Sequence, residues 1–282
     1  MDLYLFRLLL KAKEVPDLFE VRAPDNSPLS REDWLKFFFS REQEFWHYRS
    51  KFVFIPETKI SVPDKPNLIF GYIARERRVH ERTPPEEGLQ PTEHLSWQAA
   101  FLALDPTDRG DDGQKVAIEL NQEIGKPKAL LNSIVRTLNQ QDGAPYFTQA
   151  FPLVGHGSFW EFAVAHNNQI VSITFDVAAP NMFRGVDDFQ EELRNLRDGE
   201  NVANVKSTLE SDTILKHGTP RMEGIVNYVE SGGGELAAEA ADGAKYSSTS
   251  HEVSETRDIE HHTRNERQFL REIAYWLDKV FP

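Results

Sequence analysis

Two carboxylates, Asp105 and Glu119, flank a turn that is rich in Asp and Gly. Carboxylates on neighbouring strands can share a divalent metal such as Mg²⁺ and so cleave a phosphodiester, with a lysine two residues later steadying the attacking water. A turn centred near Asp112 would place Asp105 opposite Glu119. Position 121 is Asn, however, where that lysine is expected. The hairpin is a candidate catalytic metal site, and the alternative is a hairpin with a solvated acidic turn.

A basic cluster lies between residues 71 and 88. It contains four arginines, which are Arg75, Arg77, Arg78 and Arg82. Guanidinium groups bind phosphate bidentately, so these side chains are candidates for nucleic-acid binding. Glu76 and Glu81 lower the local charge, and in an extended strand Arg75 and Arg77 would share one face while Arg78 lies on the other. The alternative interpretation is the solvated end of a strand.

A second candidate contact follows the Asp242-Gly243 turn. Lys245 offers a cation and Tyr246 a ring that a nucleic acid could use. Residues of these types also finish half-exposed strands, so that alternative stays open.

Periodicity predicts the elements that must position these side chains. Strands are expected at residues 3–10, 51–57, 67–77, 95–106 and 114–120, and helices near Ser30 and over 127–140. Ser30 and Asp33 are spaced as a helix cap. Three further strands, 146–154, 158–166 and 170–178, are predicted to form a meander.

The C-terminal part is predicted to be mainly helical. Acidic residues near Asp187 begin a helix, residues 202–211 continue as helix, and residues 221–234 form a helix that glycine ends. A hairpin over 235–248 follows, and the last segment is an amphipathic helix whose apolar face contacts the chain or a partner. The sequence therefore indicates an α+β protein with mainly antiparallel sheets and helices packed on their faces. We expect two associated halves, residues 1–145 and 146–282, with one compact domain as the alternative.

Composition narrows the classes of function. The 282 residues have no cysteine, which excludes disulfides and thiolate chemistry, and carry a formal net charge of −13. Such a charge argues against a protein that coats nucleic acid over its whole surface. The apolar start of the chain is interrupted by Arg7 and has no cleavage site, so we expect a soluble cytoplasmic protein without a membrane partner.

Residues 165–250 resemble an uncharacterised bacterial family, a domain of unknown function whose members occur beside retron reverse transcriptases in phage defence. The resemblance rests on "PNMF" after a strand, a charged helix, the glycines of "ESGGGE" and the ending "KYSS". It implies a defence effector or toxin and supplies no catalytic residues.

Three functions follow as hypotheses. The first is an antiviral defence component that binds or acts on nucleic acid, or belongs to a complex containing it. The second is a non-catalytic assembly protein that contacts protein partners or further copies of itself through its terminal amphipathic helix and acidic faces, which deletion of residues 266–282 would test. The third is a nuclease that uses Asp105, Glu119 and Mg²⁺.

Overall fold

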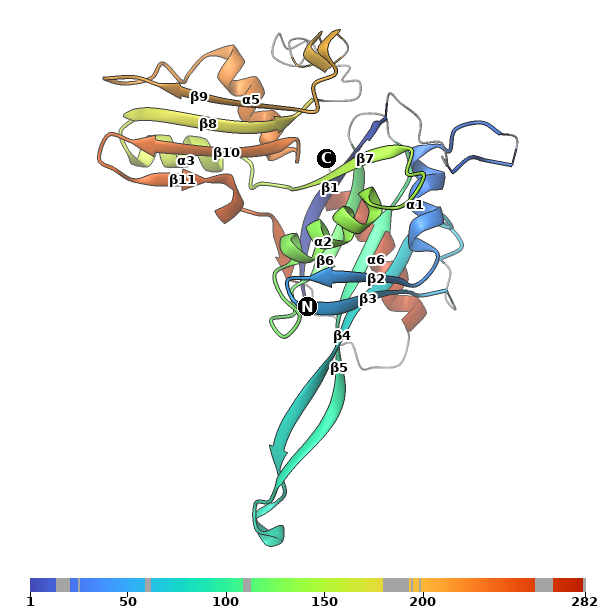
Figure 1. Cartoon of the computed structure of the whole chain (residues 1–282). Coiled ribbons are helices and arrows are strands. Elements are labelled where there is room, and N and C mark those ends of the chain that lie inside the picture. Colours follow the sequence, from blue (N-terminus) through green and yellow to red (C-terminus); the bar gives the residue numbers. More distant parts are fainter. Residues whose placement is uncertain are drawn as a thin grey trace.

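The computed structural model contains two antiparallel sheets in one α+β chain (Figure 1), so the predicted fold class is confirmed. It describes residues 1–13, 21–24, 26–58, 62–108, 113–179, 193, 195–197, 199–256 and 266–280. The expected start of a helix near Asp187 and the "PNMF" segment lie outside these residues.

The larger sheet has eight strands in the order β12-β1-β6-β5-β4-β3-β2, with β7 also paired to β1. Their bounds are β1 Asp2–Ala12, β2 Gln43–His47, β3 Ser50–Pro56, β4 Ile69–Arg82, β5 Pro91–Asp105, β6 Gln114–Glu119, β7 Tyr146–Pro152 and β12 Ser254–Thr256. β1 has three partner strands, since it pairs with β12 at its start, with β6 along its middle and with β7 towards its end.

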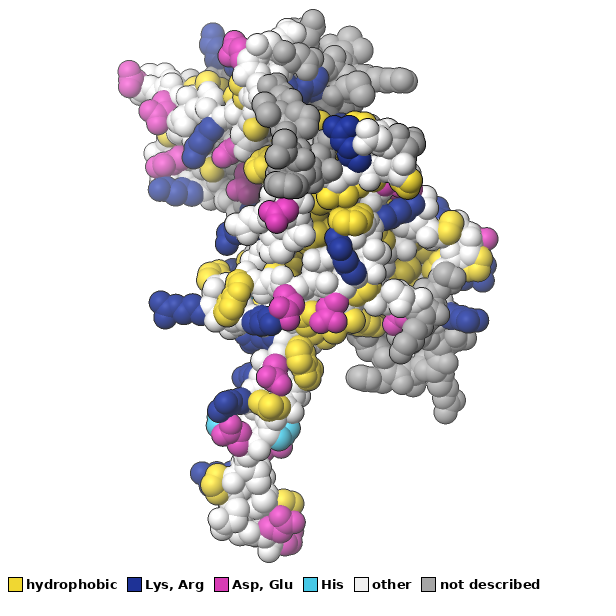
Figure 2. All heavy atoms as spheres, turned by 45° about the vertical axis from the view of Figure 1, so that its right-hand side comes forward, with side chains coloured by type: hydrophobic (Ala, Val, Ile, Leu, Met, Phe, Trp, Pro, Cys, Tyr) yellow, Lys and Arg dark blue, Asp and Glu magenta, His cyan; other side chains and the backbone are white. Residues whose placement is uncertain are grey.

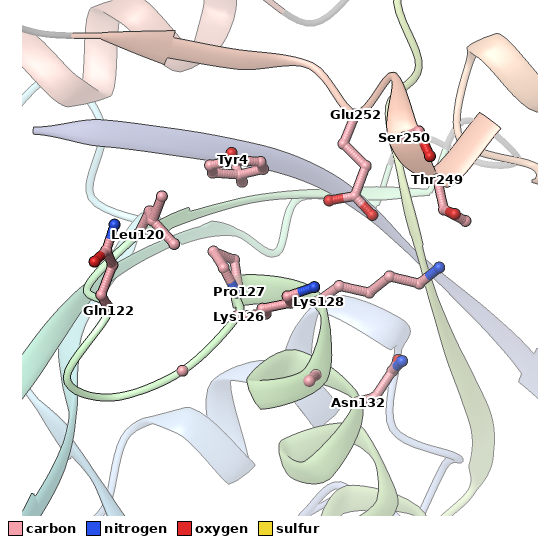
Figure 3. A pocket seen from close by; sticks show the side chains of 12 residues that line it. Tyr4, Leu120, Gln122, Lys126, Pro127, Lys128, Asn132, Thr249, Ser250 and Glu252 are labelled. Atoms are coloured by element: carbon pink, nitrogen blue, oxygen red, sulfur yellow. The ribbon is translucent and has the colours of Figure 1, made fainter. Parts of the chain in front are cut away.

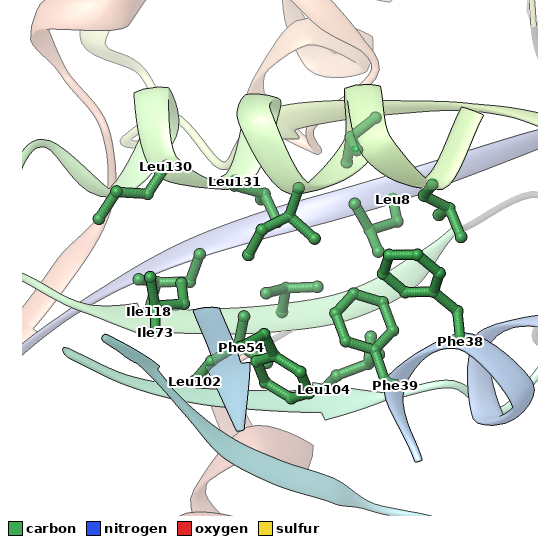
Figure 4. Close-up of a cluster of buried hydrophobic side chains, with 14 of the residues drawn as sticks. Leu8, Phe38, Phe39, Phe54, Ile73, Leu102, Leu104, Ile118, Leu130 and Leu131 are labelled. Carbon is green, nitrogen blue, oxygen red and sulfur yellow. The ribbon is translucent and has the colours of Figure 1, made fainter. Parts of the chain in front are cut away.

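Two helices cover one face of the larger sheet: α1 (Arg31–Phe39) and α2 (Pro127–Asn139). Figure 4 shows Leu130 and Leu131 of α2 above strand residues such as Leu102, with Phe38 and Phe39 of α1 at the side. α1 begins as predicted, since the Ser30 side chain accepts a hydrogen bond from the Asp33 N–H at 3.0 Å. This face holds the largest apolar cluster among the described residues.

The terminal helix α6 (Glu266–Val280) covers the opposite face of the same sheet. Ile273 and Leu277 are fully buried there against strand residues that include Leu3 and Phe101. The expected amphipathic helix is therefore present, and its apolar face is used inside the chain. Removing this helix would expose the sheet, so its deletion cannot test partner binding alone.

The smaller sheet has the order β11-β10-β8-β9, with β8 at Ile170–Ala178, β9 at Asn204–Glu210, β10 at Gly234–Ala240 and β11 at Lys245–Ser247. Helices α3 (Ser158–Ala165) and α5 (Pro220–Glu230) bury their apolar residues against one of its faces. The predicted hairpin at Asp242-Gly243 joins β10 to β11, and Gly243 adopts a positive φ of 84° in it.

Two predicted elements are wrong in type. Residues 158–165 form helix α3 instead of a strand, because the buried carboxylate of Glu230 accepts the Gly157 N–H at 2.8 Å at the start of the helix. Residues 204–210 form strand β9 instead of helix, and their half-buried and exposed residues alternate as a sheet edge requires. The expected meander is thereby lost, since β7 belongs to the larger sheet.

The two sheets share a seam that does not coincide with the middle of the chain. β7, β12 and α6 come from the second half of the sequence but complete the larger sheet and its core. Across the seam, Arg7 Nε donates to the Ser231 carbonyl at 3.1 Å, and the Lys11 ammonium donates to the Val202 carbonyl at 3.2 Å.

Replacing Ile273 by Ala should destabilise the protein by about 2–5 kcal/mol, because it leaves a cavity between α6 and the sheet. Denaturant unfolding measures the change. Glu272→Ala, on the exposed side of the same helix, should stay within about 0.5 kcal/mol of the parent. Equal effects of the two substitutions would contradict the packing of α6 described here.

Candidate functional site

The most prominent feature is a two-stranded arm made by the outer parts of β4 and β5, residues 75–98. The strands pair continuously from Ile69–Leu104 to Arg82–Pro91, and a short 3₁₀ turn at Pro85–Glu87 closes the tip. The neighbouring strands stop early: β3 pairs with β4 as far as Ala74, and β6 pairs with β5 from Leu102. The arm therefore projects from the body of the protein (Figures 1 and 2).

The four candidate arginines all lie on this arm, divided between its two faces. Cross-strand partners point to the same side of a sheet, so Arg75 and Arg77 share one face with Gln98 and Ser96. The other face carries Arg78 opposite Leu95, and Arg82 opposite Pro91. The structure thus brings the arginines together in pairs and not as one basic patch.

Each arginine also has a partner within the chain. Arg75 donates to the Glu123 carbonyl, and Arg77 forms an ion pair with the Glu123 carboxylate. Arg78 Nη1 lies 3.3 Å from the Glu93 carboxylate. Arg82 instead donates to the Leu89 carbonyl, at 3.0 Å. These exposed interactions are weak, yet they show that acidic and carbonyl groups already surround the cations.

The arm also exposes large apolar side chains. Leu95 and Trp97 leave 60% and 59% of their surface in solvent, and both lie on the face that carries Arg78. Figure 2 shows hydrophobic side chains among charges of both signs along the projection. Residues 75–98 contain four arginines and five glutamates, so the formal charge of the arm is −1.

The hairpin register separates the candidate metal ligands. Asp105 pairs with Lys115, whereas a turn centred at Asp112 would pair it with Glu119. Glu119 lies four residues further along β6, a separation of roughly 13 Å at about 3.3 Å per residue. Its carboxylate accepts the Phe101 N–H at 2.9 Å. The expected juxtaposition of Asp105 and Glu119 is wrong, and it was the geometric basis for the nuclease hypothesis.

Asp105 belongs to a row of buried charged residues. Arg7, Lys115 and Asp105 are cross-strand neighbours on β1, β6 and β5, and their exposed fractions are 4%, 3% and 5%. Ionised side chains are buried only when partners compensate them, so this row has a structural role. Within the described residues, no group of three or more His, Asp or Glu side chains could hold a metal ion.

Of the second candidate contact, Lys245 is accessible to a ligand and Tyr246 is not. Tyr246 is 4% exposed, its hydroxyl lies 2.8 Å from the Ser158 hydroxyl, and burial raises its pKa. Its ring cannot stack on a base without unfolding the edge of the sheet. Lys245 is exposed, 3.7 Å from the Glu239 carboxylate.

A pocket of about 810 Å³ lies where the start of α2 meets β1 and the segment before β12. Figure 3 shows Tyr4 and Glu252 across this space from Lys126, Pro127 and Lys128. Its two lysines, Lys126 and Lys128, are matched by Glu252 in the lining and by Glu235 beside it. Lys128 lies 2.6 Å from the Glu235 carboxylate, and both lysines attract Glu252. The pocket is thus a mixed polar and apolar hollow without a preference for anions.

Burial raises the pKa of the Glu252 carboxyl. Lys128 acts against this shift, Glu235 adds to it, and Lys126 again opposes it. Glu252 is consequently the pocket residue whose charge is most sensitive to acid.

Sequence reasoning identified the arginines but missed Leu95, Trp97 and Glu123. Leu95 and Trp97 are apolar at alternate positions, which predicts a buried strand face. The sequence does not show that β4 and β5 run beyond the ends of β3 and β6, and this extra length is what leaves the two side chains exposed. Glu123 lies in the loop between β6 and α2, and nothing in the sequence indicates that it meets the base of the arm.

Comparison of the chain with family models, curated proteins and solved structures gave no match. No helix in the described part of the chain is long and apolar enough to cross a membrane.

Glu252→Gln should increase stability at pH 7 relative to the parent. The carboxyl binds its proton more tightly in the folded state than in the unfolded chain, so the parent loses folding free energy as pH rises through and above 4.5. The amide cannot ionise and lacks this loss. Denaturant unfolding between pH 4 and 7 measures it, with Glu42→Gln, at an exposed position, as control. A parent and variant with parallel pH profiles would contradict the buried environment of Glu252.

Proposed function

We propose that this protein is a non-catalytic assembly protein that docks onto a protein partner through the β4–β5 arm. The single observation that carries the proposal is the arm itself: a long ribbon that leaves the body and exposes Leu95 and Trp97 on one face. Projecting apolar side chains rimmed by charges are typical of protein interfaces, where tryptophan and arginine contribute most of the binding energy.

The charges of the arm favour a protein partner over nucleic acid. A formal charge of −1 does not attract phosphate, and each arginine has a carboxylate or carbonyl partner in the chain. Mixed charges beside apolar residues match the polar rim and apolar centre of a protein interface. The resemblance over residues 165–250 supports placing the complex in phage defence.

Removing the arm should abolish complex formation while leaving the fold intact. Arg75 pairs directly with Gln98, so residues 76–97, which include Leu95 and Trp97, can be replaced by an Asn-Gly turn that closes the shortened strands. The body should keep its cooperative unfolding, since both apolar cores of the larger sheet lie beyond the cut. Co-purification with the products of neighbouring genes measures binding.

Point variants test whether binding requires the apolar side chains of the arm or only the ribbon itself. Leu95→Ser combined with Trp97→Ser should weaken binding by more than tenfold, because interface tryptophans are frequent hot spots. Val164→Ser removes a similarly exposed apolar side chain from α3 and should bind like the parent. A truncated protein that still forms the complex would refute docking through the arm.

Nucleic-acid binding is the second candidate, favoured by the shape of the arm. A two-stranded ribbon fits the major groove of DNA, and the Arg78 side chain is largely exposed. This function predicts a band shift that weakens as salt increases, and a further loss in the Arg78→Ala, Arg82→Ala double variant. Mobility-shift assays with DNA and RNA at low and moderate salt test it. Absence of salt-sensitive binding would exclude the direct contact.

A further inference from the structure

We propose that two copies of this chain pair along the β4 edges of their arms, antiparallel and centred on Val79. This inference rests on the proposed function and names the partner at this edge, which is a second copy of the chain. It follows from the free strand edge, from the order of charges along it and from exposed residues beside it.

The edge of β4 beyond Ala74 is available for pairing. β3 pairs with β4 through Val53–Ala74 and no further, so within the described residues 75–82 have β5 as their one neighbouring strand. Main-chain N–H and C=O groups on the other side of the strand are left without a strand partner. Such an edge is a template for another extended chain.

The charges along this edge are complementary to themselves. In antiparallel pairing centred on Val79, Glu76 lies opposite Arg82 of the second copy, and Arg77 lies opposite its Glu81. Two-fold symmetry repeats both contacts, which gives four pairs of opposite charge. Cross-strand pairs of opposite charge stabilise a sheet, and like charges directly opposite each other destabilise it.

The charges also favour this register over the two registers that are displaced from it by one residue. A slip of one residue in one direction places Arg75 opposite Arg82 and Glu76 opposite Glu81. A slip in the other direction places Arg77 opposite Arg82 and Arg78 opposite Glu81, so its repulsive and attractive contacts offset each other. In the central register Arg78 faces His80 of the second copy. The Glu93 carboxylate lies 3.3 Å from the Arg78 guanidinium and 3.6 Å from the His80 ring in the same arm.

The body offers an exposed surface on the side where the second arm would lie. The sheet order places β3 and β2 on the β4 side of the arm, where Trp46 of β2 and Tyr48 of the turn that follows it are exposed. With Arg82 of the second copy opposite Glu76, its tip and the exposed Leu89 approach this turn. Pro84 and Pro85 lack N–H donors, so strand pairing stops there, before it meets β3.

Sedimentation equilibrium of the full chain over about a hundredfold range of concentration tests the proposal. The parent should form a dimer. Glu76→Arg should weaken the dimer about tenfold or more, because two attractive contacts become repulsive, and Arg82→Glu should do the same. Glu210→Arg makes the same charge change on β9 of the smaller sheet and should leave the dimer unchanged.

Mixing the two single variants distinguishes this register from other contacts. Each variant repels itself, but a mixed dimer restores all four attractive pairs and should form with nearly the affinity of the parent. The double variant, with both substitutions in one chain, should likewise recover. Failure of both recoveries would overturn the register. Dimerisation that depends on Leu95 and Trp97 instead would assign the contact to the other edge or face.

The outcomes also separate this inference from the proposed function. A chain that stays monomeric but needs its arm to bind another protein overturns self-pairing and leaves the assembly function standing. A dimer that persists after replacement of residues 76–97 overturns self-pairing through the arm. Salt-sensitive binding of nucleic acid by a monomeric chain would overturn self-pairing and favour the second candidate function.

Discussion

A buried arginine at the seam between the two sheets constrains much of the fold. Arg7 lies on β1, which pairs with β6, β7 and β12, and its side chain reaches the Ser231 carbonyl at the end of α5. A Cβ atom on Gly232 would come within 2.7 Å of the Arg7 side chain, and Gly232 has a φ of 86°, so glycine is required there on two grounds. Because the ionised group cannot be left without partners in the interior, the larger sheet, α5 and the turn that leads to β10 must form together. This explains why segments of the second half of the chain complete the core of the first.

The core holds the base of the arm in place. β4 and β5 are anchored by buried residues such as Ile73 and Leu102, whereas their outer parts run beyond the ends of β3 and β6. The loop between β6 and α2 braces the base of the arm, since Glu123 binds two of its arginines. The same loop lines the pocket through Leu120. A body with a braced projection that has two edges is suited to presenting a surface, and in the described part of the chain no group of three or more His, Asp or Glu side chains could hold a metal ion.

Local signals in the sequence predicted most elements, and contacts between distant residues account for the failures. The cap at Ser30, the amphipathic pattern of α6 and the turn at Asp242-Gly243 involve neighbouring residues, so they could be read directly. α3 could not, because the carboxylate at its start comes from Glu230, 73 residues beyond Gly157. The candidate metal site failed because Asp105 pairs with Lys115 and not with Glu119, and a change of register changes every cross-strand pair. The arginines were located, but the partners that neutralise them lie on another strand or another loop.

The alternating charges of the arm limit which chains can pair with its exposed strand edges. A long exposed edge composed of apolar residues would pair with any extended chain, and natural proteins prevent this with charged side chains. Here the order of Glu76, Arg77, Glu81 and Arg82 does more than prevent pairing, because it favours one register over the two that are displaced from it by one residue. A uniformly basic edge would serve phosphate binding and repel a second copy of itself. The interspersed glutamates therefore weaken nucleic-acid binding and permit selective pairing with a surface of mixed charge.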